Sequence, residues 1–477
     1  MSLLSNAKWN SFSQFFKIII QVVNLVYLAK IIPPADYGIM AMAAVVTNLA
    51  VLVRDLGTSA AIIQKKQLTE ELKNTIFWLN SIMGMVICVI ICFSSQWIAE
   101  LYSQPKLGNV LLLISVIFPL SSCAAAHLAL MERESEFKKI SFIEVSSSLT
   151  SVIIAVIMAH MGYGVYSLVG QAITLNLMSA VQFWISSKWS PSVKRFINLS
   201  ELKQIFSFSA NLSLFNLINY ISRNGDSFII GRYMSSVILG NYNLAYRIML
   251  FPLQSLTFVA SRSLYPILSK YQDDNKKILS TYNECVFIIV LITAPLMAGI
   301  AILSEPFIHI VFGAQWKITA DVLKWLAPTA IIQSVLSTTG AVFSAKGRTD
   351  VLLKLGILGT VLQFGAFLIG VNFSITTFAF CYLIANVLNF FPVMYALLYL
   401  LSGQLSSFLY KLLPILLSTL FMLFIVKVID TFLYSISNIT SYGMLFLFAV
   451  VGFLSYNISL LILSKKIRVF MLNVCKK

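Results

Sequence analysis

The sequence of 477 residues predicts an all-α, polytopic integral membrane protein with about fourteen transmembrane helices. Three observations predict this fold class. Hydrophobic residues make up 58% of the chain and charged residues only 11%, whereas soluble domains carry about 25% charged residues. Long apolar runs recur along the whole chain, and the basic residues gather in the connections on one side of them. The composition therefore excludes a soluble globular enzyme and a disordered chain.

The apolar runs are long enough to cross about 30 Å of hydrocarbon as helices. They form helices because backbone groups find no water partner in lipid and the runs are too long for barrel strands. The predicted spans of the first half are 12–32, 37–57, 77–98, 108–130, 140–161, 165–186 and 207–231. Those of the second half are 237–261, 282–303, 322–343, 351–371, 375–400, 409–429 and 442–463. The connection before the third span contains QKKQLTEELKN, which predicts a short amphipathic helix that opens at Thr69.

The basic residues predict the orientation of the chain. Of 34 Lys and Arg residues, 22 lie in connections on the side of the N-terminus and 3 (Lys106, Arg232 and Lys317) lie on the opposite side. Because cytoplasmic loops accumulate Lys and Arg, both termini are predicted to be cytoplasmic. This distribution explains the net charge of +16 without a nucleic-acid partner.

An internal repeat is predicted from two polar helix faces. In the first and seventh spans, polar residues recur at offsets of 0, 3, 7 and 10, which is one face of a helix. They are Gln14, Lys17, Gln21 and Asn24 in the first span and Asn216, Asn219, Arg223 and Asp226 in the seventh. The shift along the sequence that takes Gln14 to Asn216 also takes Gly38 to Gly240. We therefore expect a six-helix lobe at 1–206, a second at 207–400, and two extra helices with a basic tail at 401–477, with any substrate site between the lobes.

Charged residues inside the spans are the candidate functional groups, because each costs at least about 2.5–3.5 kcal/mol to insert. Most lie within about a turn of a span end and are interpreted as interface anchors: Lys30, Arg54, Asp55, Glu144, Glu284, Lys324, Lys354, Lys411 and Lys427. Four lie deeper, namely Lys17, Arg223, Asp226 and Arg247.

Two interpretations of the deeper charges stay open. They could form structural ion pairs, for example between Arg223 and Asp226. Alternatively, the two polar faces and Arg247 line a cationic, water-filled cavity that binds an anion such as a phosphate. In that case Asp226 is the candidate for ion coupling, and Arg54 with Asp55 could close the inner mouth.

Other chemistry finds no support in the sequence. The nucleotide-binding loop GxxxxGK[ST] is absent, so ATP is not expected to drive the protein directly. His127, His160 and His309 are far apart, and the six cysteines form no CxxC pair. We predict no catalytic residues, no metal site and no cofactor.

Several segments resemble the polysaccharide transporter family. These are KIIPPADYGIMAMA, RDLGTSAAIIQKKQLTEELKNTIFWLN, LALMERESEFKKISFIEV, GYGVYSLVGQ and SRNGDSFIIGRYMSSVILGNYNLAYRIMLFP. This family holds the Wzx-type O-antigen and exopolysaccharide flippases of the multidrug/oligosaccharidyl-lipid/polysaccharide exporter superfamily, and the colanic and teichuronic acid exporters are the most similar branch.

The resemblance implies two six-helix lobes in a V and alternating access in the bacterial inner membrane. It implies that an undecaprenyl-diphosphate-linked oligosaccharide moves from the cytoplasmic to the periplasmic leaflet, with membrane lipids and a polymerase and chain-length regulator of the same pathway as partners.

Two alternatives remain. A lipid II or multidrug exporter would share the fold, but a cation exporter should carry acidic groups in its cavity. A membrane polysaccharide polymerase would need acidic catalytic groups or a sizeable outer loop, whereas the longest outer connection is 304–321.

Overall fold

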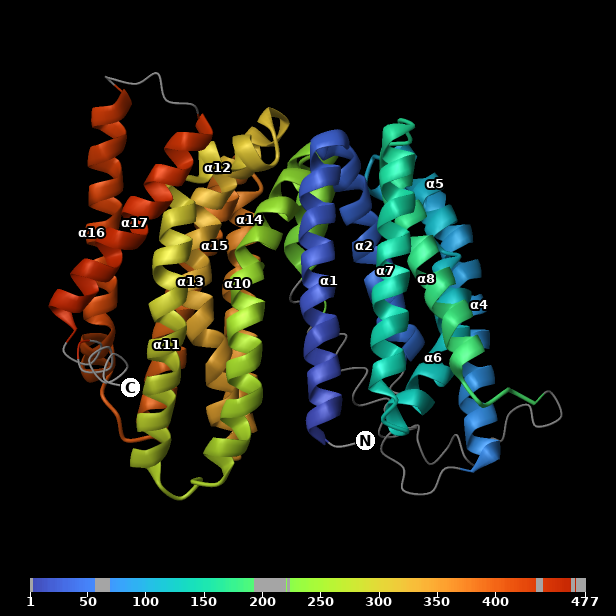
Figure 1. Ribbon diagram of the computed structural model, residues 1–477, viewed down its shortest axis with the longest axis horizontal. Helices are drawn as coiled ribbons and strands as arrows, with labels where there is room; N and C mark the ends of the chain where they lie inside the picture. Colours follow the sequence, from blue (N-terminus) through green and yellow to red (C-terminus); the bar gives the residue numbers. More distant parts are fainter. Residues whose placement is uncertain are drawn as a thin grey trace. The chain divides into compact units, whose positions relative to one another are not determined.

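The computed structural model describes residues 3–55, 69–192, 220, 224–434, 441–464 and 468. These residues form helices joined by short turns, and no strand occurs among them. The chain divides into two compact units, Met1–Gly240 and Asn241–Lys477. Within each unit the long helices run beside one another (Figure 1).

The helices of the two units have the following bounds. The first unit holds α1 (Leu3–Ile31), α2 (Pro34–Asp55), α4 (Glu70–Leu101), α5 (Pro105–Ile114), α6 (Ile117–Arg133), α7 (Phe137–His160) and α8 (Val165–Ser186). Helix α10 (Ser236–Ser269) begins at the end of the first unit and continues into the second. The second unit also holds α11 (Asn275–Ile302), α12 (Ser304–Val311), η1 (Ala314–Trp316), α13 (Lys317–Ala345), α14 (Thr349–Gly370), α15 (Ile375–Leu400), α16 (Leu405–Tyr434) and α17 (Ser441–Leu463).

The predicted membrane spans agree with these helices. Helices α8 and α15 begin and end at the predicted residues. Among the described residues, 11 helical segments are long and apolar enough to cross a membrane. Helices α1 and α10 occupy the first and eighth predicted spans, whereas only residues 220 and 224–231 of the seventh are described. The all-α membrane fold is confirmed, and the count of fourteen stays a prediction.

The fourth predicted span is not one continuous helix, which corrects the expectation for residues 108–130. It is divided into α5 and α6 at Ser115 and Val116. Pro119 has no N–H to donate to the carbonyl of Ser115, and the Phe118 N–H donates to that carbonyl instead, at 3.0 Å. Proline is tolerated in the first turn of α6, where an N–H would have no helical partner.

The helix predicted to open at Thr69 also differs from expectation. The Thr69 hydroxyl accepts a hydrogen bond from the Leu72 N–H at 3.1 Å, so the predicted N-cap is confirmed. The helix does not stop after the amphipathic segment, however, but continues as α4 through 32 residues. The Thr69 cap therefore begins one helix that contains both the predicted amphipathic segment and the third predicted span.

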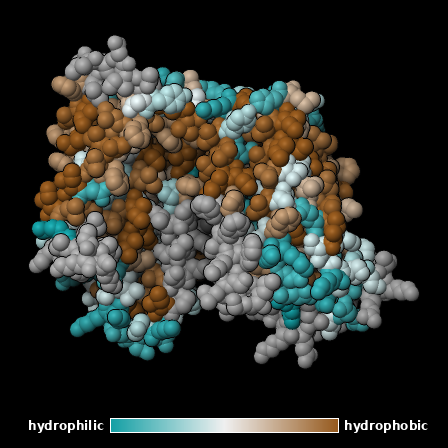
Figure 2. All heavy atoms as spheres, in the orientation of Figure 1, coloured by the Kyte–Doolittle hydropathy of each residue, from teal (hydrophilic) through white to brown (hydrophobic). Residues whose placement is uncertain are grey.

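Large apolar side chains cover the outer surface of both units. Phe93, Phe142, Ile185 and Phe446 are each exposed by more than two-thirds, at 87%, 72%, 79% and 73%. On the face shown in Figure 2, apolar residues dominate the middle, and hydrophilic residues gather toward the helix ends. Because such exposed apolar area is unfavourable in water, this surface is suited to contact with lipid.

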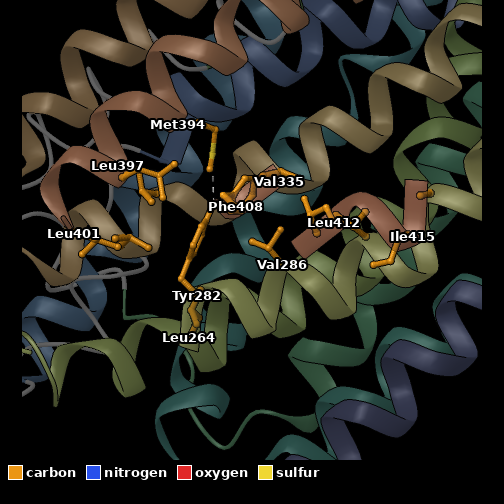
Figure 3. Packing of buried hydrophobic residues seen from close by; sticks show 14 of the residues in the cluster. Leu264, Tyr282, Val286, Val335, Met394, Leu397, Leu401, Phe408, Leu412 and Ile415 are labelled. Carbon is orange, nitrogen blue, oxygen red and sulfur yellow. Dashed lines mark hydrogen bonds between the residues drawn. The ribbon is translucent and has the colours of Figure 1, made fainter. Parts of the chain in front are cut away.

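The core of the second unit joins α16 and α17 to the preceding helices. Tyr282 of α11 stacks against Phe408 of α16, with ring centroids 6.4 Å apart, and its hydroxyl approaches the Met394 sulfur at 3.7 Å (Figure 3). The Tyr456 hydroxyl of α17 donates to the Leu291 carbonyl of α11 at 2.9 Å. The last two helices therefore share one core with α11, α13 and α15.

The same succession of helix pairs packs in both units. In the first, α4 packs on α6, α6 on α8, and α8 on α7. In the second, α11 packs on α13, α13 on α15, and α15 on α14. This correspondence agrees with the predicted six-helix repeat, while the predicted divisions at residues 206 and 400 stay predictions.

A buried amide holds α10 to the start of α13. The Asn241 side-chain oxygen accepts from the Thr319 N–H at 3.0 Å and from the Thr319 hydroxyl at 2.9 Å. Both residues are fully buried. Thr319 is the third residue of α13, where an N–H has no partner in its own helix, so Asn241 satisfies it from the neighbouring helix.

We expect Asn241→Ala to lower the free energy of unfolding by about 1–3 kcal/mol, because the Thr319 N–H and hydroxyl would stay buried without an acceptor. Asn243→Ala is the matched control two residues away, since the Nδ2 atom of Asn243 is buried without a hydrogen-bond partner. The comparison requires thermal unfolding of both variants in one detergent. Equal losses would show that the capping bond contributes nothing.

Candidate functional site

The segments PPADYG and GYGVYS meet at one end of the first unit. Asp36 of α2 is buried, and its carboxylate accepts the Val165 N–H at the start of α8 at 3.1 Å. Gly164 has φ +54, and a Cβ atom there would overlap the Asp36 carboxylate. A negative group at a helix N-terminus is favourable, so this glycine and Asp36 together fix how α8 begins.

The two glycines related by the predicted repeat lie against each other's helix within residues Met1–Gly240. A Cβ atom on Gly38 would overlap the Ser236 carbonyl, and one on Gly240 would overlap the Pro34 carbonyl. Each glycine therefore faces the carbonyl located four residues before the other. Only hydrogen side chains allow the first turns of α2 and α10 to approach so closely.

The polar face of α1 is joined to α7 and α8. The Lys17 ammonium forms an ion pair with the Glu144 carboxylate of α7, with Nζ 3.0 Å from Oε2. The Asn24 amide donates to the Gln171 side-chain oxygen of α8 at 3.4 Å. Near the other end of α1, the Tyr27 hydroxyl lies 2.8 Å from the His160 Nε2 atom.

Part of the α1 face that was predicted to line a cavity therefore contacts α7 and α8 instead. Gln14 and Gln21 are exposed, while Lys17 and Asn24 are half-buried. Lys17 keeps 22% of its side chain exposed, so it still reaches the surface of the unit beside its partner.

Glu144, interpreted from the sequence as an interface anchor, has a partner on another helix, and its position relative to the interface stays a prediction. Helix α7 begins at Phe137, three residues before the predicted span, which places Glu144 two turns inside the helix. Its partner lies 127 residues away in the chain. The available signal was a carboxylate among apolar and hydroxyl side chains, but no local pattern identifies such a distant lysine.

The second polar face is described only in part. Asn216, Asn219 and Arg223 lie outside the described residues, so the structure does not test whether Arg223 pairs with Asp226. Asp226 is buried, and its carboxylate accepts the Ser227 N–H at 2.6 Å. Arg247 is exposed on α10.

The two candidates for the inner mouth lie at the end of α2. The Arg54 guanidinium donates a hydrogen bond to the Ser121 hydroxyl of α6. Asp55 is the last residue of α2, and its side chain lies outside the described part. Arg54 therefore joins two helices of one unit, and its role in a mouth stays a prediction.

A buried histidine lies among aromatic rings between α4, α6 and α8. The His127 ring centroid is 4.7 Å from that of Trp184, 5.5 Å from Trp189 and 6.0 Å from Phe77. His127 is fully buried, and neither ring nitrogen has a hydrogen-bond partner. Within the described residues, no group of three His, Cys, Asp or Glu side chains could hold a metal ion.

Near these rings, three hydrogen bonds hold the segment that follows α8 against α4. The Trp189 indole donates to the Glu70 carboxylate at 3.0 Å, and the Trp78 indole donates to the Ser192 carbonyl at 3.2 Å. The Ser192 N–H in turn donates to the Asn74 side-chain oxygen at 2.6 Å. Trp78 and Trp189 lie in distant parts of the sequence, so no local pattern predicts their shared cluster.

The family model described as "Polysaccharide biosynthesis protein" matches residues 27–321. The chain is 29% identical over 371 residues to the lipopolysaccharide biosynthesis protein WzxC of Escherichia coli (strain K12), covering 77% of this chain and 75% of that protein. It is 28% identical over 410 residues to the teichuronic acid biosynthesis protein TuaB of Bacillus subtilis (strain 168), covering 85% and 84%.

Two solved structures share the fold. The lipid II flippase MurJ in an inward closed conformation matches with a TM-score of 0.70 at 18% identity, over 95% of this chain and 98% of that one. An inward-facing multidrug resistance MATE family transporter of the MOP superfamily matches with a TM-score of 0.57 at 16% identity, over 80% and 95%. At these identities the likeness shows the fold alone.

We expect His127→Leu to keep or raise the thermal unfolding midpoint, because leucine is apolar and an imidazole buried without hydrogen bonds costs about 1–3 kcal/mol. His160→Leu is the comparison, since it removes the exposed bond to Tyr27. Thermal unfolding in detergent measures both. A large loss of stability in His127→Leu alone would show that the imidazole itself is required among these rings.

Proposed function

The chain belongs to the polysaccharide biosynthesis protein family, and on that premise we propose that it is a flippase for lipid-linked oligosaccharides. The cargo is an oligosaccharide repeat unit on undecaprenyl diphosphate, moved from the cytoplasmic to the periplasmic leaflet of the bacterial inner membrane. WzxC and TuaB are named for the synthesis of surface polysaccharides, and MurJ is named a lipid II flippase.

The observation that carries the proposal is the partly exposed ammonium of Lys17 on α1, inside the first predicted span. Glu144 is one anionic partner of this cation, and the partial exposure of Lys17 leaves room for an anionic group of the cargo as a second. Arg247, exposed on α10, adds a second basic group. A diphosphate is the anionic part of the proposed cargo, whereas cationic drugs would favour acidic groups.

The proposed mechanism is alternating access without chemistry on the cargo. Basic side chains bind the diphosphate, and the protein opens first to one leaflet and then to the other. The close approach at Gly38 and Gly240 holds the first turns of α2 and α10 together.

The energy source is proposed to be an ion gradient, with Asp226 carrying the coupling proton. Its carboxylate is buried inside a predicted span, where an ionisable group is expensive and usually functional. A polymerase and a chain-length regulator of the same pathway would take the flipped product.

The direct test is flipping of a fluorescent polyprenyl-diphosphate oligosaccharide in proteoliposomes. We expect the protein to accelerate flipping, Arg247→Ala to reduce the rate by about tenfold or more, and Arg247→Lys to retain more activity, since charge is kept. Asp226→Asn should lose gradient-driven accumulation but keep slow downhill flipping. Lys324→Ala, which breaks an exposed ion pair with Asp321, is the control.

Wild-type protein that leaves the flipping rate unchanged would contradict the proposed function. Equal losses in Arg247→Ala and Arg247→Lys, with normal folding, would mean that guanidinium geometry rather than charge is needed. Full accumulation by Asp226→Asn would remove Asp226 from the coupling mechanism.

The proposed orientation places both termini in the cytoplasm. In a variant without the six native cysteines, single cysteines at Lys106 and Lys317 should react with an impermeant thiol reagent in intact cells. Those at Lys138 and Lys276 should react only after lysis. All four side chains are exposed, so access depends on the side of the membrane alone. Labelling of Lys138→Cys in intact cells would contradict this topology.

A further inference from the structure

The ion pair between α1 and α7 belongs to a cluster of three charged groups. Lys17 Nζ lies 3.0 Å from Glu144 Oε2. Glu132 of α6 lies close enough to Glu144 for the two carboxylates to interact electrostatically. Lys17 thus faces at least one carboxylate, and Glu144 faces both a cation and a second carboxylate.

These are the charged groups that face Glu144 from the helices packed on α7. Helix α1 contributes Lys17 and α6 contributes Glu132, whereas α8 carries no charged residue between Val165 and Ser186. On α7 itself the next charged residue toward the N-terminus is Lys139, more than a turn away. Lys17 is therefore the charged group in direct contact with Glu144.

The pair is accessible as well as intramembrane. The Lys17 side chain is 22% exposed and the Glu144 side chain 33% exposed. A paired lysine presents little net positive charge to an arriving anion, so the anion must replace the carboxylate at the ammonium. Partial exposure makes such an exchange possible without unpacking the helices.

We propose that Glu144 is an internal counter-ion that competes with the anionic group of the cargo for Lys17, and so sets the charge that a cargo must carry. This inference rests on the proposed function, because it concerns a diphosphate on a lipid. A dianionic head group displaces Glu144, whereas an uncharged polyprenol cannot. Glu144 is therefore a residue that positions Lys17 and determines specificity.

The test is a binding cycle on the purified full-length protein in nanodiscs, with undecaprenyl diphosphate and undecaprenol as probes. We expect Glu144→Gln to bind the diphosphate about fivefold or more tightly than the wild type. Lys17→Gln should weaken binding, and adding Glu144→Gln to it should change nothing, because the competitor has lost its target. Undecaprenol binding should stay the same throughout.

Glu136→Gln is the matched control, since Glu136 forms an ion pair of 2.8 Å with Lys139 at the exposed start of the same helix. It should leave diphosphate affinity unchanged. Thermal unfolding of every variant separates competition from a purely structural ion pair. If Glu144→Gln lowers both stability and affinity, the pair is structural and the inference is overturned.

The outcomes also distinguish this inference from the proposed function. Tight diphosphate binding and flipping by the wild type, with unchanged or weaker binding by Glu144→Gln, would overturn the inference and leave the flippase proposal standing. Absence of diphosphate binding by the wild type would overturn both. Glu144→Gln could also raise the affinity for the diphosphate equally in the wild type and in the Lys17→Gln variant. That result would show that Glu144 repels the anion without acting through Lys17.

Discussion

The hydrocarbon interior offers no hydrogen-bond partner to a backbone N–H or C=O group, and the rest of the structure follows from this constraint. It makes every described span a helix and restricts interruptions to places where the released groups find other partners. At Ser115 the carbonyl that Pro119 cannot serve accepts from Phe118. At the start of α13, the Asn241 side chain serves the Thr319 N–H from another helix. At both places a named donor or acceptor replaces the missing helical partner.

The same constraint applies to side-chain charge. A lone ammonium on α1 would be expensive in lipid, and Glu144 of α7 compensates for it. Asp36 is likewise buried, but its carboxylate faces the N-terminus of α8. In contrast, His127 lies among Phe77, Trp184 and Trp189 without a hydrogen bond, which is affordable only as the neutral imidazole. Lys17 and Asp36 thus have polar partners, whereas the buried His127 ring packs against aromatic side chains.

For a carrier of anionic lipids, a paired cation has a functional consequence. A cavity with permanently unpaired lysines and arginines would bind phosphate tightly and release it slowly. A carboxylate beside the lysine lowers the affinity and returns the site to a neutral state after release. Stability in the membrane and turnover of the cargo would then both require that Lys17 and Glu144 form an ion pair.

The sequence alone determined the all-helical membrane fold, the bounds of α8 and α15, the Thr69 cap and the family, because hydrophobic length, capping and signature segments are local properties of the chain. It also predicted that Lys17 lies on the polar face of the first span. Only the tertiary structure decided that Glu144, 127 residues away, is its partner, and that Asp36 caps α8. The reason is physical: a local pattern tells which residues share a helix face. Which other helix meets that face depends on how all the helices pack.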